Sequence, residues 1–361
     1  MKKSIIYLFL ILFNSVNLAC LNEDDAAIPI SPLTGIVVSP DVGGPSQPNQ
    51  VWVDLSEQTH QINQRTDWDL GFYSGDEFRV ILNYSIMMAA GSINSTDIDA
   101  VNEADFQSLK IQMSSVAGLL PEFIDNVKGD YLNDGTVIQE ISANDAENKV
   151  YLLKLGYNLF QGEIPMYTTN VTGSSRGYKK IRILRNDANS YKIQYADLNE
   201  TSHQEFIVQK DSDFHFSFFS FNTENVVSVQ PMKQDWDICF TVFNNVIPVL
   251  GTYIFSDFVL SNTLSNVASY EVIGDPLSIE NQYNQFSNSS VNPSLFIEND
   301  QTSIGANWRV TVDGTVSTPV INSDRFYVIK DSEGAFYKLR FISMLNESNQ
   351  RGYPLFEYEA L

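Results

Sequence analysis

Two stretches of the chain share one pattern of apolar and polar positions. In each, alternating apolar residues lead through a turn into a tryptophan block, Asp67–Phe72 (Asp-Trp-Asp-Leu-Gly-Phe) and later Asp235–Phe240 (Asp-Trp-Asp-Ile-Cys-Phe). Alternation with a period of two, rich in aromatic and β-branched residues, is the sequence signal of a strand. A block that recurs at this distance indicates two related modules rather than one large fold.

A second repeated element closes each module. A hairpin is predicted over residues 180–195 and again over 325–341, each with a polar turn between two alternating strands. The modules therefore share their ends and differ in their middles, where loops and ligand sites usually lie. One helix is predicted in the first middle, over 104–117, because Phe106, Leu109, Met113 and Val116 recur at helical spacing.

The pattern predicts a mostly-β chain with short helical insertions and four parts. Residues 1–19 form a signal peptide, 20–50 a flexible tether rich in proline, glycine and serine, 51–202 the first module and 203–361 the second. Each module is long enough to bury its own core.

The first residues resemble a bacterial lipoprotein signal. Lys2 and Lys3 precede an apolar run too short for a typical membrane span, and Leu18-Ala19-Cys20 resembles a processing site at which Cys20 takes lipid. An ordinary secretory signal with a chance cysteine is the alternative. The acidic stretch Leu21–Asp25 resembles the surface-export signal of Bacteroidetes lipoproteins, or is simply a solvated start to the tether. The expected location is the outer membrane, lipid-anchored and at the cell surface.

Composition excludes several classes of function. The formal net charge of −22 repels nucleic acid. Apart from Cys20, the one cysteine is Cys239, so no internal disulfide or cysteine-based metal cluster is expected, and Cys239 is interpreted as a small buried residue. No nucleophile elbow, metal-binding helix motif or phosphate-binding loop is present, and we expect no enzyme.

At this point the residues resemble the HmuY family, haem-binding lipoproteins of Bacteroidetes that work with a TonB-dependent outer-membrane receptor. The resemblance rests on ordered segments in both modules. In the second module these are Phe219–Phe221, Val226–Val229, Asp235–Ile238, Phe326–Ile329, Tyr337–Phe341 and Phe356–Tyr358, and in the first they are Trp52–Ser56 and Trp68–Leu70.

The resemblance implies β modules that present haem between loops, with the iron held by two axial side chains. In the best-known member these are histidines of the middle segment. The three histidines of this chain, His60, His203 and His215, lie outside the middle segments, so no histidine ligand is carried over.

Methionine also ligates haem iron through its thioether. Met87, Met88 and Met166 of the first middle segment are therefore the haem-ligand candidates. Ordinary core packing is the alternative for each of them, as for Met113 on the predicted helix. Tyrosine ligation is a further possibility, and the middle segments offer Tyr84, Tyr167, Tyr270 and Tyr283.

The repeated blocks themselves predict structural roles. Trp68 and Trp236 are expected to anchor the core, and Asp69 and Asp237 to accept backbone hydrogen bonds near strand ends. Two functions remain open. One is a surface lipoprotein that binds haem or a related porphyrin for iron acquisition. The other is a lipid-anchored binding or adhesion module for a glycan or protein, without haem.

Overall fold

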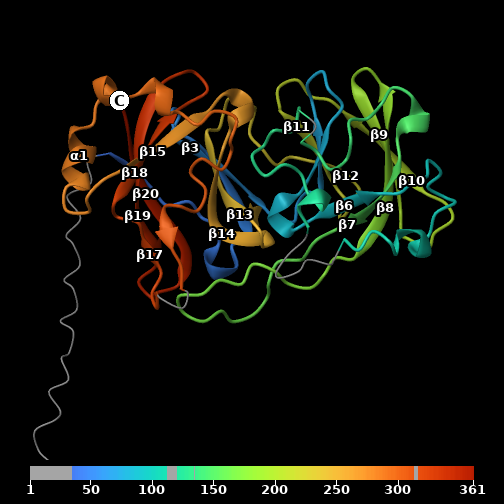
Figure 1. Cartoon of the computed structure of the whole chain (residues 1–361), viewed down its shortest axis with the longest axis horizontal. Coiled ribbons are helices and arrows are strands. Elements are labelled where there is room, and N and C mark those ends of the chain that lie inside the picture. Colours follow the sequence, from blue (N-terminus) through green and yellow to red (C-terminus); the bar gives the residue numbers. More distant parts are fainter. Residues whose placement is uncertain (1–34, 112–119, 134, 313–315) are drawn as a thin grey trace, which may run out of the picture. The chain divides into compact units, whose positions relative to one another are not determined.

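Antiparallel strands dominate the computed structural model of the chain, which describes residues 35–111, 120–133, 135–312 and 316–361 (Figure 1). The α-helix of the described residues is α1 (Ile279–Gln285). The mostly-β fold with short helical insertions is confirmed. The short 3₁₀ turns are η1 (Gly44–Ser46), η2 (Tyr84–Ile86), η3 (Glu103–Phe106), η4 (Pro121–Phe123), η5 (Asp145–Glu147), η6 (Thr263–Ser265), η7 (Asn288–Ser290) and η8 (Pro293–Leu295).

Two facing sheets make up what we call the first lobe. The five-stranded sheet runs in the order β10 (Gln204–Gln209), β9 (Ser190–Ala196), β8 (Tyr178–Asp187), β7 (Val150–Lys154) and β6 (Ala89–Ser92). The four-stranded sheet runs in the order β12 (Asn225–Val227), β11 (Phe216–Ser220), β4 (Leu70–Tyr73) and β5 (Val80–Leu82).

The second lobe repeats this arrangement. Its five-stranded sheet runs in the order β1 (Ile36–Val38), β20 (Arg351–Ala360), β19 (Phe336–Leu345), β18 (Arg325–Lys330) and β15 (Ala268–Ile273). Its four-stranded sheet runs in the order β14 (Gly251–Ser261), β13 (Ile238–Ile247), β2 (Asn49–Asp54) and β3 (Thr59–Gln64). A small ribbon of β16 (Arg309–Val310) and β17 (Val320–Ile321) completes the described strands.

The opening strands are exchanged between the two sequence modules. Strand β2, which opens the first module, pairs with β13 of the second tryptophan block, with Val53 opposite Ile238. Strand β11 of the second module pairs with β4 of the first block, with Phe219 opposite Leu70. Each lobe is therefore completed by an opening strand of the other module.

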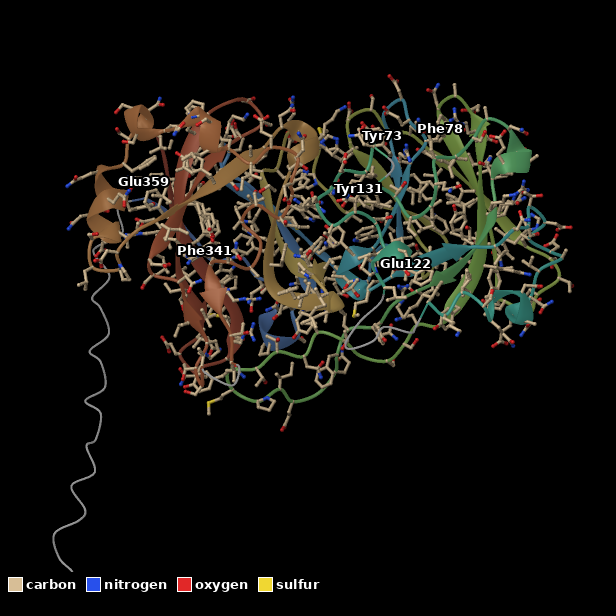
Figure 2. The ribbon with its side chains drawn as sticks, viewed as in Figure 1. Tyr73, Phe78, Glu122, Tyr131, Phe341 and Glu359 are labelled. Atoms are coloured by element: carbon tan, nitrogen blue, oxygen red, sulfur yellow. The ribbon has the colours of Figure 1, made fainter. Side chains whose placement is uncertain are left out.

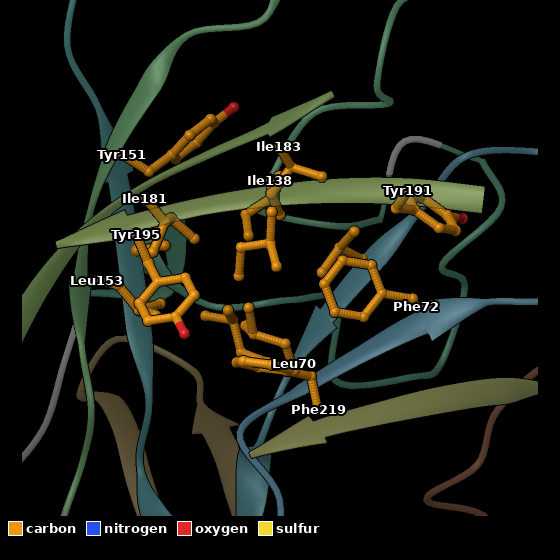
Figure 3. Packing of buried hydrophobic residues seen from close by; sticks show 14 of the residues in the cluster. Leu70, Phe72, Ile138, Tyr151, Leu153, Ile181, Ile183, Tyr191, Tyr195 and Phe219 are labelled. Atoms are coloured by element: carbon orange, nitrogen blue, oxygen red, sulfur yellow. The ribbon is translucent and has the colours of Figure 1, made fainter. Parts of the chain in front are cut away.

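The central strands of both four-stranded sheets, β11 and β4 in the first lobe and β13 and β2 in the second, are buried on both faces. Within the first lobe, side chains of the two sheets meet in one core, as Figure 3 shows for Leu70, Phe72 and Phe219 facing Leu153, Ile181 and Ile183. A corresponding core fills the second lobe. The opposite faces of the four-stranded sheets pack on each other through Trp52, Trp68, Phe216, Phe218, Trp236, Cys239 and Phe258, which we call the inter-sheet layer. Burial on both faces explains the near-continuous apolar runs of β11 and β13.

The strand registers correct the predicted match between the closing hairpins. Ala89 of β6 lies opposite Lys154 of β7, and Ala268 of β15 lies opposite Lys330 of β18. Strand β7 is thus the equivalent of β18, and β8 the equivalent of β19. The hairpin over 180–195 is therefore the equivalent of β19 and β20, and the sequence match is one strand too late. The reason is the long loop over 155–177, which separates β7 from β8, whereas a short turn joins β18 to β19.

Two other expectations change with the structure. The predicted helix over 104–117 is only the 3₁₀ turn η3 in its described part, and Lys110 has a left-handed φ of 48°, which ends a helix. Met113 and the rest of that segment lie outside the described residues, as do the signal peptide, Cys20 and the tether up to residue 34. The tether from residue 35 to 50 is folded, because β1 pairs with β20.

Candidate functional site

The two tryptophan blocks occupy matching positions in the inter-sheet layer, where Trp68 and Trp236 are both buried. Each is held by an asparagine further along the chain. The Nδ2 of Asn83 donates to the carbonyl oxygen of Trp68 at 2.7 Å, and the Nδ2 of Asn262 donates to that of Trp236 at 2.9 Å. The blocks therefore position η2 and η6, the turns that follow these asparagines.

The aspartates of the blocks hold the exchanged strands. Asp69 Oδ2 accepts a hydrogen bond from the backbone N–H of Phe221 at 2.7 Å, directly after β11. Asp237 Oδ2 accepts from the N–H of Leu55 at 2.9 Å, directly after β2. In both cases the donor belongs to the other sequence module. Each carboxylate thus satisfies a buried backbone donor across the exchange.

The three candidate methionines lie in different surroundings. Met88 is 1% exposed and belongs to the core of the first lobe. Met87 ends η2 with a left-handed φ of 61° and is also buried. Met166 is 59% exposed on the long loop between β7 and β8. The neighbouring Tyr167 N–H donates to the Asn349 carbonyl oxygen of the second lobe. The structure therefore does not gather these thioethers in one cavity.

The described residues of the first lobe form a polar groove of about 670 Å³. Its polar lining comes from Arg79, Glu122, Asn126, Gln139 and Glu140, and Figure 2 labels Glu122. Among the described residues, no methionine, histidine or tyrosine lines it. Its size is that of a ligand site, but its described walls supply carboxylates and amides rather than donors for haem iron.

A different set of side chains meets in the inter-sheet layer. His215, Tyr84, Tyr131, Gln230 and Trp236 surround a cavity of about 30 Å³. Burial lowers the pKa of His215 to about 4, so its imidazole is neutral at pH 7. Burial raises the pKa values of Tyr84 and Tyr131, so both phenols stay protonated. In this cavity imidazole and phenol groups line the same space.

The same cavity holds two polar atoms without a partner among the described residues. They are Nε1 of Trp236, a donor, and Oε1 of Gln230, an acceptor. The ring nitrogen Nε2 of His215 already pairs with Oγ of Ser265 at 2.8 Å. A space of this volume with one free donor and one free acceptor suits a single water molecule.

A second small cavity, of about 20 Å³, lies beside the same tyrosines. Met88, Asp125 and Asn244 line it together with Tyr84 and Tyr131. The Asp125 carboxyl accepts hydrogen bonds from the backbone N–H groups of Leu82 at 2.6 Å and Val137 at 2.9 Å. Burial outweighs these bonds and raises its pKa to about 7.

Haem does not fit either of these two cavities in this conformation. His215, Tyr84, Tyr131 and Met88 can ligate iron, but they surround cavities of about 30 and 20 Å³. Ligand pockets for molecules of this kind measure roughly 300–1,000 Å³. The polar groove has the volume but lacks the donors. Sequence reasoning missed this cluster because His215 lies directly before the opening strand β11, and only the facing of the two sheets brings it to the tyrosines.

Arg65 fixes the turn that carries Tyr84 and Met87. Its guanidinium is 1% exposed and donates to the carbonyl oxygens of Ser85 at 2.5 Å, Val171 at 2.8 Å and, through Nε, Gln47 at 2.6 Å. Burial lowers its pKa to about 9. One side chain thus joins η2, the long loop of the first lobe and the N-terminal segment.

The described residues contain no group of three or more histidines, cysteines or acidic residues that could hold a metal ion. None of the helices among them has the length and apolar character to cross a membrane. His60 is exposed, and His203 Nδ1 pairs with Asp99 at 2.9 Å near the module boundary.

No curated protein matches the chain. Among solved structures, an HmuY-like protein of Bacteroides vulgatus is 16% identical, covering 39% of this chain and 82% of that one with a TM-score of 0.23. An apo HmuY analogue of Tannerella forsythia is 9% identical, covering 92% of this chain and 98% of that one with a TM-score of 0.22. Similarity at this level carries no argument about function. The HmuY protein family, however, matches residues 46–209 and again residues 212–358. The chain therefore belongs to the HmuY family and contains two HmuY regions in tandem.

Proposed function

We propose that this protein binds haem or a related porphyrin for iron acquisition, as a lipoprotein anchored through Cys20 in the outer membrane and facing the cell surface. The observation that carries the proposal is the pair of HmuY family matches, which together cover most of the chain. The proposed role is binding rather than catalysis. The expected partner is a TonB-dependent outer-membrane receptor that takes over the ligand.

The geometry limits how such a ligand binds. His215, Tyr84 and Tyr131 supply neutral imidazole and phenol groups in the inter-sheet layer, but their cavity has the volume of one water molecule. Met87 and Met166 remain candidate ligands on separate segments. Binding at the cavity of His215 or at buried Met87 requires a conformation other than the one described, whereas Met166 is already exposed.

The test is a haem titration of the chain from residue 21, with absorbance spectra in both oxidation states. We expect saturable binding and a sharp Soret band. Replacing His215, Met87 and Met166 by alanine, one at a time, identifies the ligand by the loss of that band. Far-UV circular dichroism of each variant separates loss of a ligand from loss of the fold. Weak, non-saturating binding with a featureless spectrum in both states would overturn the proposal.

A second candidate is a lipid-anchored binding or adhesion module for a glycan or protein, without haem. The polar groove of about 670 Å³ favours it, because carboxylates and amides suit a hydroxyl-rich ligand better than a porphyrin. Glu122→Gln and Gln139→Ala should then weaken glycan binding on an array without changing the response to haem.

A further inference from the structure

The hairpin of β13 and β14 extends far beyond the rest of its sheet. Strand β2 pairs with β13 only over Ile238–Phe240, whereas β13 and β14 remain paired out to Ile247 opposite Gly251. A register shift between Thr241 and Phe243 marks the point where this extension begins. We call residues 243–255 the arm.

The base of the arm is firmly packed. Phe243 stacks on Phe258 with ring centroids 4.8 Å apart and meets Tyr84 of the first lobe at 5.1 Å. Phe255 contacts both Phe258 at 5.9 Å and Tyr253 at 5.1 Å. The arm is therefore held in place at its base.

The tip of the arm is apolar and exposed. Val249 is 100% exposed, Leu250 47% and Tyr253 46%. Val249 also has a φ of 71°, a conformation that is strained for a β-branched residue. Strain and consecutive exposed apolar residues both cost stability, and both are retained mainly where they serve binding.

The arm is also uncharged in a strongly acidic protein. No ionisable acidic or basic residue lies between Asp237 and Asp257, although the chain carries a formal net charge of −22. A basic partner would be recognised by the acidic surface elsewhere, not by this hairpin. An uncharged apolar tip followed by a tyrosine matches a membrane interface, where aliphatic side chains enter the acyl boundary and tyrosine lies at the headgroups.

We propose that the tip of the arm docks on the lipid bilayer, with Val249 and Leu250 inserted and Tyr253 at the headgroup level. The inference rests on the proposed envelope location. The chain between Cys20 and Gly35 spans at most about 50 Å when fully extended, so a lipid on Cys20 keeps the folded body within reach of the membrane. The arm then fixes which face of the body lies against the bilayer.

The test uses the chain from residue 21, which lacks the lipid and contains the whole described fold, in flotation with phosphatidylcholine vesicles. We expect measurable binding that added salt does not weaken. The double variant Val249→Asp, Leu250→Asp should lower the partition coefficient at least tenfold. The matched control is the double variant Leu277→Asp, Leu295→Asp, at apolar residues that are 82% and 51% exposed, and it should leave binding unchanged.

Three outcomes would overturn the proposal: no flotation of the wild-type chain, an equal effect of the control variant, or binding that needs anionic lipid and disappears in salt. A haem titration of the double variant separates this result from the proposed function. If the double variant loses flotation but still binds haem with an unchanged Soret band, the arm contributes to membrane binding and not to haem binding.

Discussion

Asp69 of the first lobe and Asp237 of the second lobe are equivalent buried aspartates, and the two lobes neutralise them in different ways. In the first lobe, the Arg176 guanidinium donates to both carboxylate oxygens of Asp69, at 2.5 and 3.2 Å. In the second lobe, burial and then repulsion from Asp54 and Asp331 raise the pKa of Asp237 to about 7, although Leu55 donates to it. Asp69 is therefore neutralised by the cation of Arg176, and Asp237 by a bound proton.

The difference follows from the length of one connection. Arg176 lies at the end of the long loop that joins β7 to β8 in the first lobe. The equivalent connection, between β18 and β19, is a short turn that begins with Asp331. A longer connector can bring a cation to the buried carboxylate, whereas the short turn brings another acid. Connector length, rather than the tryptophan block, thus sets the charge of this site.

The strongest test of the comparison expresses two fragments of the chain and asks which of them folds. Residues 66–230 contain the whole first lobe with its exchanged strands β11 and β12, and we expect them to fold. Residues 51–202 contain the first sequence module but lack β10 and β11, so β4 keeps only β5 as a neighbour, and we expect no cooperative unfolding transition. Circular dichroism melts of the two fragments check this prediction. Folding of 51–202 alone would show that each module can complete itself.

The next largest effect comes from removing the cation of the first lobe. Arg176→Met leaves the Asp69 charge buried without its partner, which costs about 3–5 kcal/mol of unfolding free energy. Denaturation in urea at pH 7 measures the loss. The control is Lys179→Ala, which removes the exposed ion pair with Asp197 and should cost at most about 1 kcal/mol. Equal losses in the two variants would contradict the comparison.

The protonated aspartate of the second lobe predicts a pH dependence. Between about pH 4 and 7 folded Asp237 keeps a proton that the unfolded chain has lost, so rising pH lowers the unfolding free energy. Asp237→Asn removes this dependence because an amide does not titrate, and the amide oxygen can still accept from Leu55. The unfolding free energy of the variant relative to wild type should therefore rise from pH 4 to 7, by at most about 1.4 kcal/mol per pH unit.

The other groups with shifted pKa values do not disturb this measurement. Asp125 has the same sign as Asp237, and His215, whose pKa falls from 6.5 to about 4, has the opposite sign over that interval. Both are present in wild type and variant, so they cancel in the difference. A difference that does not change with pH would mean that folded Asp237 is ionised.

The smallest effects concern one position at which the repeated blocks differ, Gly71 in the first and Cys239 in the second. A Cβ on Gly71 would lie 2.8 Å from Cγ1 of Ile81 and 3.1 Å from Cε1 of Phe218, so Gly71→Ala should cost about 1–3 kcal/mol. Cys239→Ala removes only a buried sulfur and should cost about 1 kcal/mol. Thermal melts rank the two. A larger loss of stability for Cys239→Ala than for Gly71→Ala would contradict the expectation that the Gly71 position is the more tightly packed.

Much of the fold could be predicted from the sequence. The strands show a two-residue alternation of apolar and polar positions, and the repetition of the tryptophan block indicates two modules. The exchange of β2 and β11 could not be predicted, since alternation shows which residues share a face and not which strand lies alongside. The predicted helix over 104–117 was wrong in its described part, because apolar spacing alone does not reveal a left-handed residue such as Lys110.

The candidate site was less predictable than the fold. Met87, Met88 and Met166 were chosen for their chemistry and their place between repeated elements, but burial in a core and exposure on a loop are decided by tertiary packing. The grouping of His215 with Tyr84 and Tyr131 depends on two sheets whose sequences lie far apart. The alternation of apolar and polar residues within a strand does not show which distant residues it will contact.

The exchanged strands also bear on how such a chain changes over generations. Since each lobe is completed by a strand encoded in the other module, a deletion that removes one module also removes a central strand from the lobe that remains. A duplication joined in this way is difficult to reverse. Selection would then retain both lobes while leaving their connectors, such as the long loop before β8, free to diverge.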